Sequence, residues 1–133
     1  MANIELLKID RDKELQGIWV DYVLGIKLRI ARARNSKYLE EIMILTEPYK
    51  KELRESEDVE KFEKILKQVR AKTILLDWQN IEDKDGNVIP YSVEKALEFF
   101  NNPELRDFYN FVILTSEDAD YYRKNLIKDS EKN

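Results

Sequence analysis

The sequence contains no cysteine and no histidine among its 133 residues, and only three glycines and three prolines. Without thiol or imidazole there is no disulfide framework, no Cys or His zinc site, and no nucleophile activated by histidine. A phosphate-binding glycine loop is excluded because the three glycines are isolated from one another. Any catalysis would depend on carboxylates, Lys, Tyr or a cation held by oxygen atoms, and we expect no enzyme and no cofactor.

Long apolar runs are also missing. No stretch approaches the roughly 18 uncharged apolar residues of a membrane span, and acidic residues interrupt the first apolar residues, unlike in a signal peptide. The lack of cysteine fits a reducing compartment. These absences lead us to expect a cytoplasmic protein with no membrane partner.

The length fits one domain of about 100 to 150 residues, so we expect residues 1–133 to form a single unit. Charged residues make up 38% of the chain and give a net charge of −4, with 13 acids against 7 bases in residues 77–133. This balance gives no reason to expect general affinity for nucleic acid.

Alternating apolar and basic residues indicate a β-hairpin over residues 17–33, with its reversal at Leu24-Gly25. Helical spacing follows over about 36–128: one helix begins after Asn35 or Ser36 and is kinked or broken at Pro48, and a long helix covers 56–77. We therefore predict an α+β fold that is predominantly α-helical, in which five or six helices follow the hairpin.

Polar residues interrupt the helical pattern after Trp78. Asp85-Gly86 favours a type I′ turn within a short hairpin or ordered loop. If Gly86 took the sixth position of a calcium loop, Ile81 and Ser92 would take the first and twelfth, where acidic ligands are needed, so we expect a turn and no metal site. Ser92 and Asn102-Pro103-Glu104 then mark two helix starts.

A last helix is expected to begin at Thr115 or Ser116 and to carry Tyr122 and Leu126. The final residues, KDSEKN, should form a frayed tail.

Two groups of residues are candidates for partner binding. Trp19, Tyr22, Trp78 and Tyr91 are aromatic residues in or beside the predicted hairpins, where they either form a recognition surface or pack the hairpins onto the helices; for Trp78 we favour packing. Lys27, Arg29 and Arg32 begin a basic stretch that ends at Lys37. We favour a solvated strand face that protects a sheet edge over a phosphate-binding site. A third interpretation is a docking surface for an acidic partner or for the chain's own acidic C-terminal half.

Three stretches carry a family resemblance over most of residues 15–123: GIWVDYVLGIKLRIARARNSKY, ILLDWQNIEDKDGNVIPYSVEKALEFF and NPELRDFYNFVILTSEDADYYR. The sequence resembles the tail assembly chaperones encoded in the tail modules of tailed phages and prophages. The matching residues are Gly17, Trp19, Val20, Asn35, Tyr38, Asp77, Trp78, Asp83, Gly86, Pro90, Tyr91, Ser92, Pro103, Glu104, Leu105, Arg106 and Phe108. Leu24-Gly25 departs from the pattern, since that turn more often holds an acidic residue before Gly.

The resemblance implies a non-enzymatic chaperone that binds the tape measure protein and helps to recruit tail tube subunits, and it leaves homo-oligomer formation open. We expect an apolar groove between helix 56–77 and the C-terminal helices, rimmed by the hairpin aromatics. The alternative hypothesis is a small nucleic-acid-binding regulator that uses residues Lys27 to Lys37, with Trp19 and Tyr22 as stacking partners.

Overall fold

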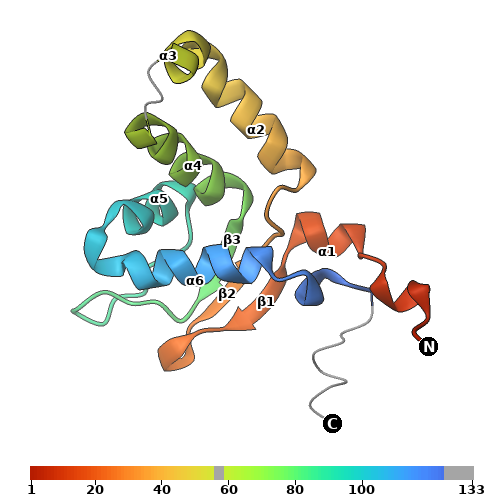
Figure 1. Cartoon of the computed structure of the whole chain (residues 1–133). Helices are drawn as coiled ribbons and strands as arrows, with labels where there is room; N and C mark the ends of the chain where they lie inside the picture. Colours follow the sequence, from red (N-terminus) through yellow and green to blue (C-terminus); the bar gives the residue numbers. More distant parts are fainter. Residues whose placement is uncertain (56–58, 125–133) are drawn as a thin grey trace.

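A three-stranded antiparallel sheet lies at the centre of the fold (Figure 1). The structure, a computed structural model, describes residues 1–55 and 59–124. The strands are β1 (Ile18–Asp21), β2 (Lys27–Ile30) and β3 (Leu75–Gln79), in the order β1-β2-β3. Both strand pairs are antiparallel, and the register shifts between Arg29 and Ile30 in the second pair.

Helices surround this sheet unevenly. In Figure 1, α6 crosses in front of the strands, α4 and α5 lie beside β3, and α2 and α3 extend away from the sheet. The α-helices are α1 (Arg11–Gln16), α2 (Ser36–Thr46), α3 (Lys50–Glu55), α4 (Val59–Thr73), α5 (Val93–Asn101) and α6 (Arg106–Glu117). Short 3-10 helices cover Ile4–Leu7, Val23–Gly25, Glu47–Tyr49, Pro103–Leu105 and Ala119–Tyr122. The predicted α+β, mainly helical class is confirmed.

The first hairpin forms where the alternating pattern predicted it. Leu24 (φ 60°) and Gly25 (φ 79°) both have left-handed backbone conformations, and the Tyr22 N–H donates to the Ile26 carbonyl at 2.7 Å. Gly17, which precedes β1, lies so close to β2 that a Cβ atom there would approach the Ile30 carbonyl group to 3.0 Å. Glycine is therefore needed at Gly17 for both its positive φ and this close approach.

Helix boundaries follow the capping and proline signals. The Asn35 side chain accepts a hydrogen bond from the Tyr38 N–H at 3.0 Å, and the Ser92 hydroxyl accepts one from the Lys95 N–H at 3.0 Å. Pro48 lies in the 3-10 turn that separates α2 from α3, as expected from a residue that lacks an N–H donor.

The predicted helix over 56–77 is wrong at its C-terminal end. Helix α4 stops at Thr73, and β3 begins at Leu75 and pairs with β2. An apolar run such as Ile74-Leu75-Leu76 fits a buried strand as well as a helix, and the pairing partner on β2 decides between them. The predicted start at Ser56 lies outside the described residues.

The predicted helix start at Thr115 or Ser116 is also wrong, because α6 continues through both residues to Glu117. Both side chains are buried, and the Ser116 hydroxyl donates to the Ile113 carbonyl at 2.6 Å. Thr115 and Ser116 therefore lie on the buried side of α6 and do not cap a helix. Asp118 instead caps the final 3-10 turn. Leu126 and the expected frayed tail lie outside the described residues.

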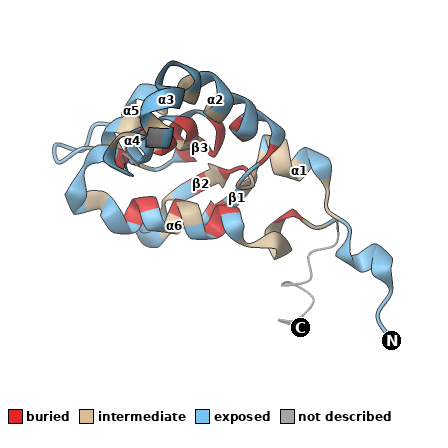
Figure 2. Cartoon of the chain, turned by 45° about the horizontal axis from the view of Figure 1, so that its top comes forward, coloured by how far each residue is buried: buried red, intermediate tan, exposed pale blue. Residues whose placement is uncertain are grey.

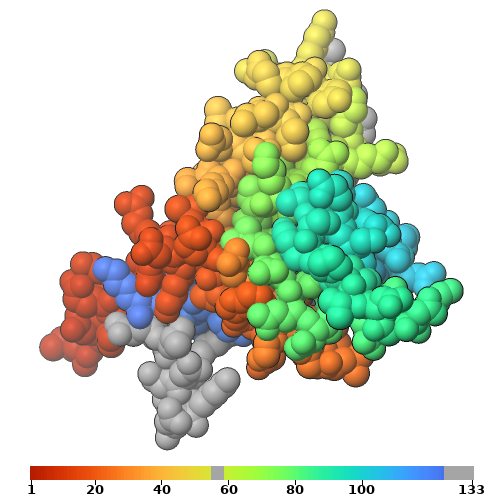
Figure 3. Space-filling model, turned by 180° about the vertical axis from the view of Figure 1, so that it is seen from behind, coloured from red at the N-terminus to blue at the C-terminus, as the bar shows by residue number. Residues whose placement is uncertain are grey.

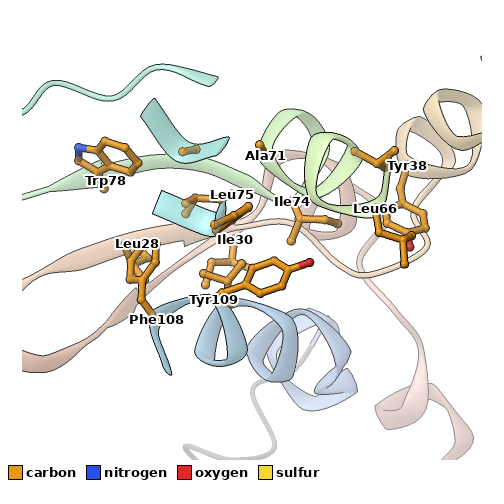
Figure 4. Close-up of a cluster of buried hydrophobic side chains, with 14 of the residues drawn as sticks. Leu28, Ile30, Tyr38, Leu66, Ala71, Ile74, Leu75, Trp78, Phe108 and Tyr109 are labelled. Carbon is orange, nitrogen blue, oxygen red and sulfur yellow. The ribbon is translucent and has the colours of Figure 1, made fainter. Parts of the chain in front are cut away.

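One apolar core joins the sheet to the helices. Buried residues, red in Figure 2, lie along α4, β3 and the side of α6 that faces the sheet, whereas α2 and α3 are mostly exposed. Figure 4 shows Leu28 and Ile30 from β2 near Phe108 and Tyr109 from α6. Tyr122 is completely buried, and its hydroxyl donates to the Ile30 carbonyl at 3.0 Å.

Candidate partner-binding site

A cavity of about 410 Å³ opens between three separate parts of the chain. We call it the apolar groove. Its walls are the hairpin turn, the loop after β3 and the junction of α5 with α6. The turn and the loop lie at the same end of the molecule in Figures 1 and 3. The lining residues are Tyr22, Val23, Ile26, Ile81, Glu82, Ile89, Phe99, Glu104, Leu105, Asp107 and Phe108.

Aromatic contacts fix the hairpin wall against α6. The ring of Tyr22 lies 4.5 Å from that of Phe111 and 5.9 Å, edge to face, from that of Phe108. Aromatic pairs in these geometries add stability beyond the area that they bury. Tyr22, one of the predicted binding aromatics, is therefore held in place at the groove.

Hydrogen bonds hold the loop wall. The Trp78 indole N–H donates to the Ile89 carbonyl at 2.8 Å, and Glu82 forms an isolated antiparallel bridge with Val88. The Asp83 carboxylate accepts from the Asn87 N–H and the Asp85 N–H, each at 2.9 Å. These bonds, chiefly the one from Asn87, lower the pKa of Asp83. The loop is thus an ordered wall of the groove.

The predicted ordered loop is confirmed, but the type I′ turn is not. That turn requires positive φ at both central residues, and Gly86 has a φ of 82° whereas Asp85 has no positive φ. The Gly86 N–H instead donates to the Asp83 carbonyl, which makes Gly86 the fourth residue of the turn. In the described part of the chain, no group of three or more Asp and Glu residues is placed to bind a metal ion.

Stacked rings form the floor of the groove. Phe99 stacks on Trp78 at a centroid distance of 5.2 Å and contacts Phe108 edge to face at 5.9 Å. Phe108 is buried, while Tyr22, Ile26, Ile81, Ile89 and Leu105 are only partly buried. The floor therefore has a firmly packed base beneath a layer of apolar side chains that a partner can reach.

Carboxylates rim this apolar floor. Glu82 comes from the loop after β3, Glu104 from the 3-10 turn before α6, and Asp107 from the first turn of α6; all three are exposed. Among the lining residues in the described part of the chain there is no Lys or Arg. The arrangement offers apolar contact surrounded by negative charge, and it suits the binding of a partner.

Comparison with known proteins identifies the family. The YdaY prophage protein family matches residues 33–133, which is more than half of the chain. The chain belongs to the YdaY prophage protein family. No curated protein and no solved structure matches the chain. The matched range includes the loop and helix walls of the groove, and the hairpin wall precedes it.

In this YdaY family member, the groove does not lie where the sequence led us to expect it. None of the described residues 59–77 lines it, because α4 packs directly against α2, α5 and β3. The C-terminal helices and the hairpin aromatic Tyr22 do contribute, as expected. The sequence did not identify Ile81, Ile89 and Leu105 as groove residues. Ile81 and Ile89 flank the turn predicted at Asp85-Gly86, and that position was the signal that pointed to them.

Trp78 is buried in the core, and Tyr91 is partly buried against it. Trp78 is 5% exposed, which confirms the packing that we favoured for it. The Tyr91 hydroxyl donates to the Leu75 carbonyl at 2.6 Å, and its ring lies 5.0 Å from that of Trp78. Burial, with a smaller effect of Asp77, raises the pKa of Tyr91 to about 12. Both aromatics support the groove from behind.

Trp19, Lys27 and Arg29 lie on the other face of the sheet. Trp19 is 44% exposed and shares a row across the strands with Arg29 and Asp77. Viewed from behind, the atoms of the strands reach the surface (Figure 3). We call this surface the exposed sheet face; it is separate from the groove.

Acidic side chains accompany most of the predicted basic stretch. Lys27 forms an ion pair with Asp21 at 2.9 Å, and Arg32 forms one with Glu14 at 3.0 Å. Arg29 faces Asp77 in the register, although its buried Nε atom has no hydrogen-bond partner. Nucleic-acid binding by this stretch stays a prediction; Lys27 and Arg32 of the stretch are paired with acidic residues of the same chain.

In residues 1–55 and 59–124, no helix combines the length and the apolar character that crossing a membrane requires. The cytoplasmic location stays a prediction.

Proposed function

We propose that this YdaY-family prophage protein is a tail assembly chaperone that acts by protein contact and without catalysis. It binds a segment of the tape measure protein in the apolar groove and helps to recruit tail tube subunits. The groove is the observation that carries the proposal: a cavity of about 410 Å³, with apolar side chains on three ordered walls. Membership of a prophage family and the resemblance to tail assembly chaperones supply the partner.

The construction of the groove supports a binding role. Recognition of an amphipathic helix needs a hydrophobic groove into which regularly spaced side chains insert. The walls here are held before a partner arrives, by the Tyr22 ring contacts on one side and the Trp78–Ile89 hydrogen bond on the other. A preformed site loses less conformational entropy on binding than one that must first be ordered.

Co-expression with the tape measure protein of the same prophage tests this function. The chain should keep that protein soluble and co-purify with it. Ile26→Lys places a charge on the groove wall and should abolish both effects. Leu114→Lys is the matched control, because Leu114 is 69% exposed on α6 and does not line the groove.

Circular dichroism and urea unfolding establish that both variants are folded. An insoluble tape measure protein in the presence of the wild-type chain would contradict the chaperone function. Equal activity of Ile26→Lys and Leu114→Lys would contradict the use of the groove.

A further inference from the structure

We infer that the apolar groove selects a helical segment whose apolar face is flanked by Lys or Arg. The inference rests on the proposed function in using the same groove, and it specifies the chemistry of the occupant.

The charge of the rim is the first argument. In the described residues, Glu82, Glu104 and Asp107 form no salt bridge, and the groove that they surround has no cation of its own. Elsewhere Asp21, Glu14 and Glu41 do pair with cations of the chain. The negative charge at the rim is therefore available to a partner, and complementary charge gives specificity to an interface.

The form of the walls is the second argument. The groove is lined by side chains from a turn, a loop and a helix junction. On the loop side, the backbone of Glu82 already pairs with that of Val88 and is not free to pair with the backbone of a partner. A partner is therefore recognised through side chains that it inserts into the floor of the groove. An amphipathic helix presents such anchors at positions i, i+3 or i+4, and i+7.

The size of the groove limits the contact. About 410 Å³ lies near the lower end of the roughly 300–1,000 Å³ range of binding pockets. It therefore receives a few large apolar side chains, while the body of the helix stays at the rim. Basic residues on either side of those anchors then lie next to the three carboxylates.

Two synthetic peptides of about 18 residues, long enough to form a helix, test the inference. Both carry the same Leu face, and one has Lys and the other Glu on its flanks. Fluorescence anisotropy should show the Lys peptide binding roughly tenfold more tightly, the combined effect expected of three exposed ion pairs. The difference should shrink at high salt, because exposed charges are screened.

A triple variant identifies the source of the selectivity. Glu82→Gln, Glu104→Gln and Asp107→Asn together should remove the preference for the Lys peptide. The control triple is Glu40→Gln, Glu63→Gln and Glu117→Gln, which changes the net charge equally at exposed positions outside the groove. It should keep the preference. Since Asp107 lies in the first turn of α6, circular dichroism must show that the helix content is unchanged.

Each outcome decides the inference. Equal binding of the two peptides, no binding of either, or the same loss in both triple variants would overturn it. A clear preference for the Lys peptide that disappears only in the rim variant supports it, even if the tape measure protein does not co-purify. In that case the proposed function fails and the chemistry of the groove stands.

Discussion

The apolar groove and the exposed sheet face both include residues of the first hairpin, but they differ in whether their charged side chains have partners of opposite charge in the chain. On the exposed sheet face, Lys27 pairs with Asp21, and Arg29 lies opposite Asp77. In the groove, three carboxylates surround an apolar floor, and no cation is found among the lining residues that the structure describes. One surface is balanced within the chain, and the other is left for a partner to balance.

This difference shows that a run of like charges along the sequence does not reveal which charged side chains are left unpaired, and so available to a partner, in the folded chain. No acid interrupts the basic stretch along the sequence, yet Asp21 and Glu14, which precede it, pair with its Lys27 and Arg32, and Asp77, far after it, lies opposite Arg29 in the sheet. The acidic rim is the reverse case. Its members are separated along the chain, and folding brings them to one opening.

The largest expected effect is a difference in the free energy of unfolding between an aromatic substitution in the groove and one on the exposed sheet face. Phe108 is 7% exposed and contacts Tyr22 and Phe99, so Phe108→Ala should lower the free energy of unfolding by about 3–5 kcal/mol. Trp19→Ala, on the exposed sheet face, should lower it by less than about 1 kcal/mol. Urea unfolding measures both, and similar losses would show that Trp19 is as much a core residue as Phe108.

The next effect concerns the loop wall. Trp78→Phe keeps an aromatic ring but removes the indole N–H that bonds to the Ile89 carbonyl. Leaving this partly buried carbonyl without its donor should destabilise the fold by about 1–3 kcal/mol. Amide hydrogen exchange should also accelerate in residues 81–91. Trp19→Phe is the control and should change neither measurement; an unchanged exchange rate in Trp78→Phe would contradict the role of this bond.

A pH titration distinguishes a buried tyrosine from an exposed one. The pKa of Tyr91 is about 12 in the folded chain against 10.0 for an ordinary tyrosine, because its neutral hydroxyl is buried. The neutral form is thus favoured by folding. Its stabilising contribution is complete below about pH 10 and is lost as the pH rises toward 12.

Tyr91→Phe should therefore reduce the fall in unfolding free energy over this range. It should not abolish the fall, because burial also raises the pKa of Tyr109 and Tyr122. If the Tyr91 hydroxyl ionised near pH 10 and the protein lost no stability, Tyr91 would lie at the surface.

The smallest effect belongs to the exposed sheet face. A double-mutant cycle with Lys27→Ala and Asp21→Ala should give a coupling energy below about 1 kcal/mol, since the Asp21 side chain is 83% exposed. High salt should remove this coupling. A coupling that is larger or insensitive to salt would mean that the pair is shielded from solvent, and the contrast with the groove would then be weaker.

Local signals predicted the elements that depend on near neighbours. The hairpin follows from alternation, the start of α2 from Asn35 and its end from Pro48. Strand β3 was missed because the same apolar residues continue the helical spacing of α4, and only pairing with β2 distinguishes the two. Helix α1 was missed because it is six residues long and has little apolar periodicity.

The site was harder to predict than the fold for the same reason. Ile26, Ile81 and Leu105 belong to three segments, and no spacing along the chain relates them. Of the predicted binding residues, Tyr22 alone lines the groove. Trp78, in β3, and Tyr91, at the end of the loop, were correctly associated with the loop; Trp78 holds it from within the core, and Tyr91 is partly buried against that core.

The hydrogen bond from Tyr122 to the Ile30 carbonyl joins residues 92 positions apart. At about 5–20 residues per second, the ribosome needs roughly 5 to 20 seconds between synthesis of the hairpin and synthesis of this tyrosine. Phe108 and Val112, which help to cover the sheet, also emerge late. During this interval the hairpin is therefore not yet packed against α6. The groove exists as a binding site only after translation has passed both the hairpin residue Tyr22 and the α6 residue Phe108.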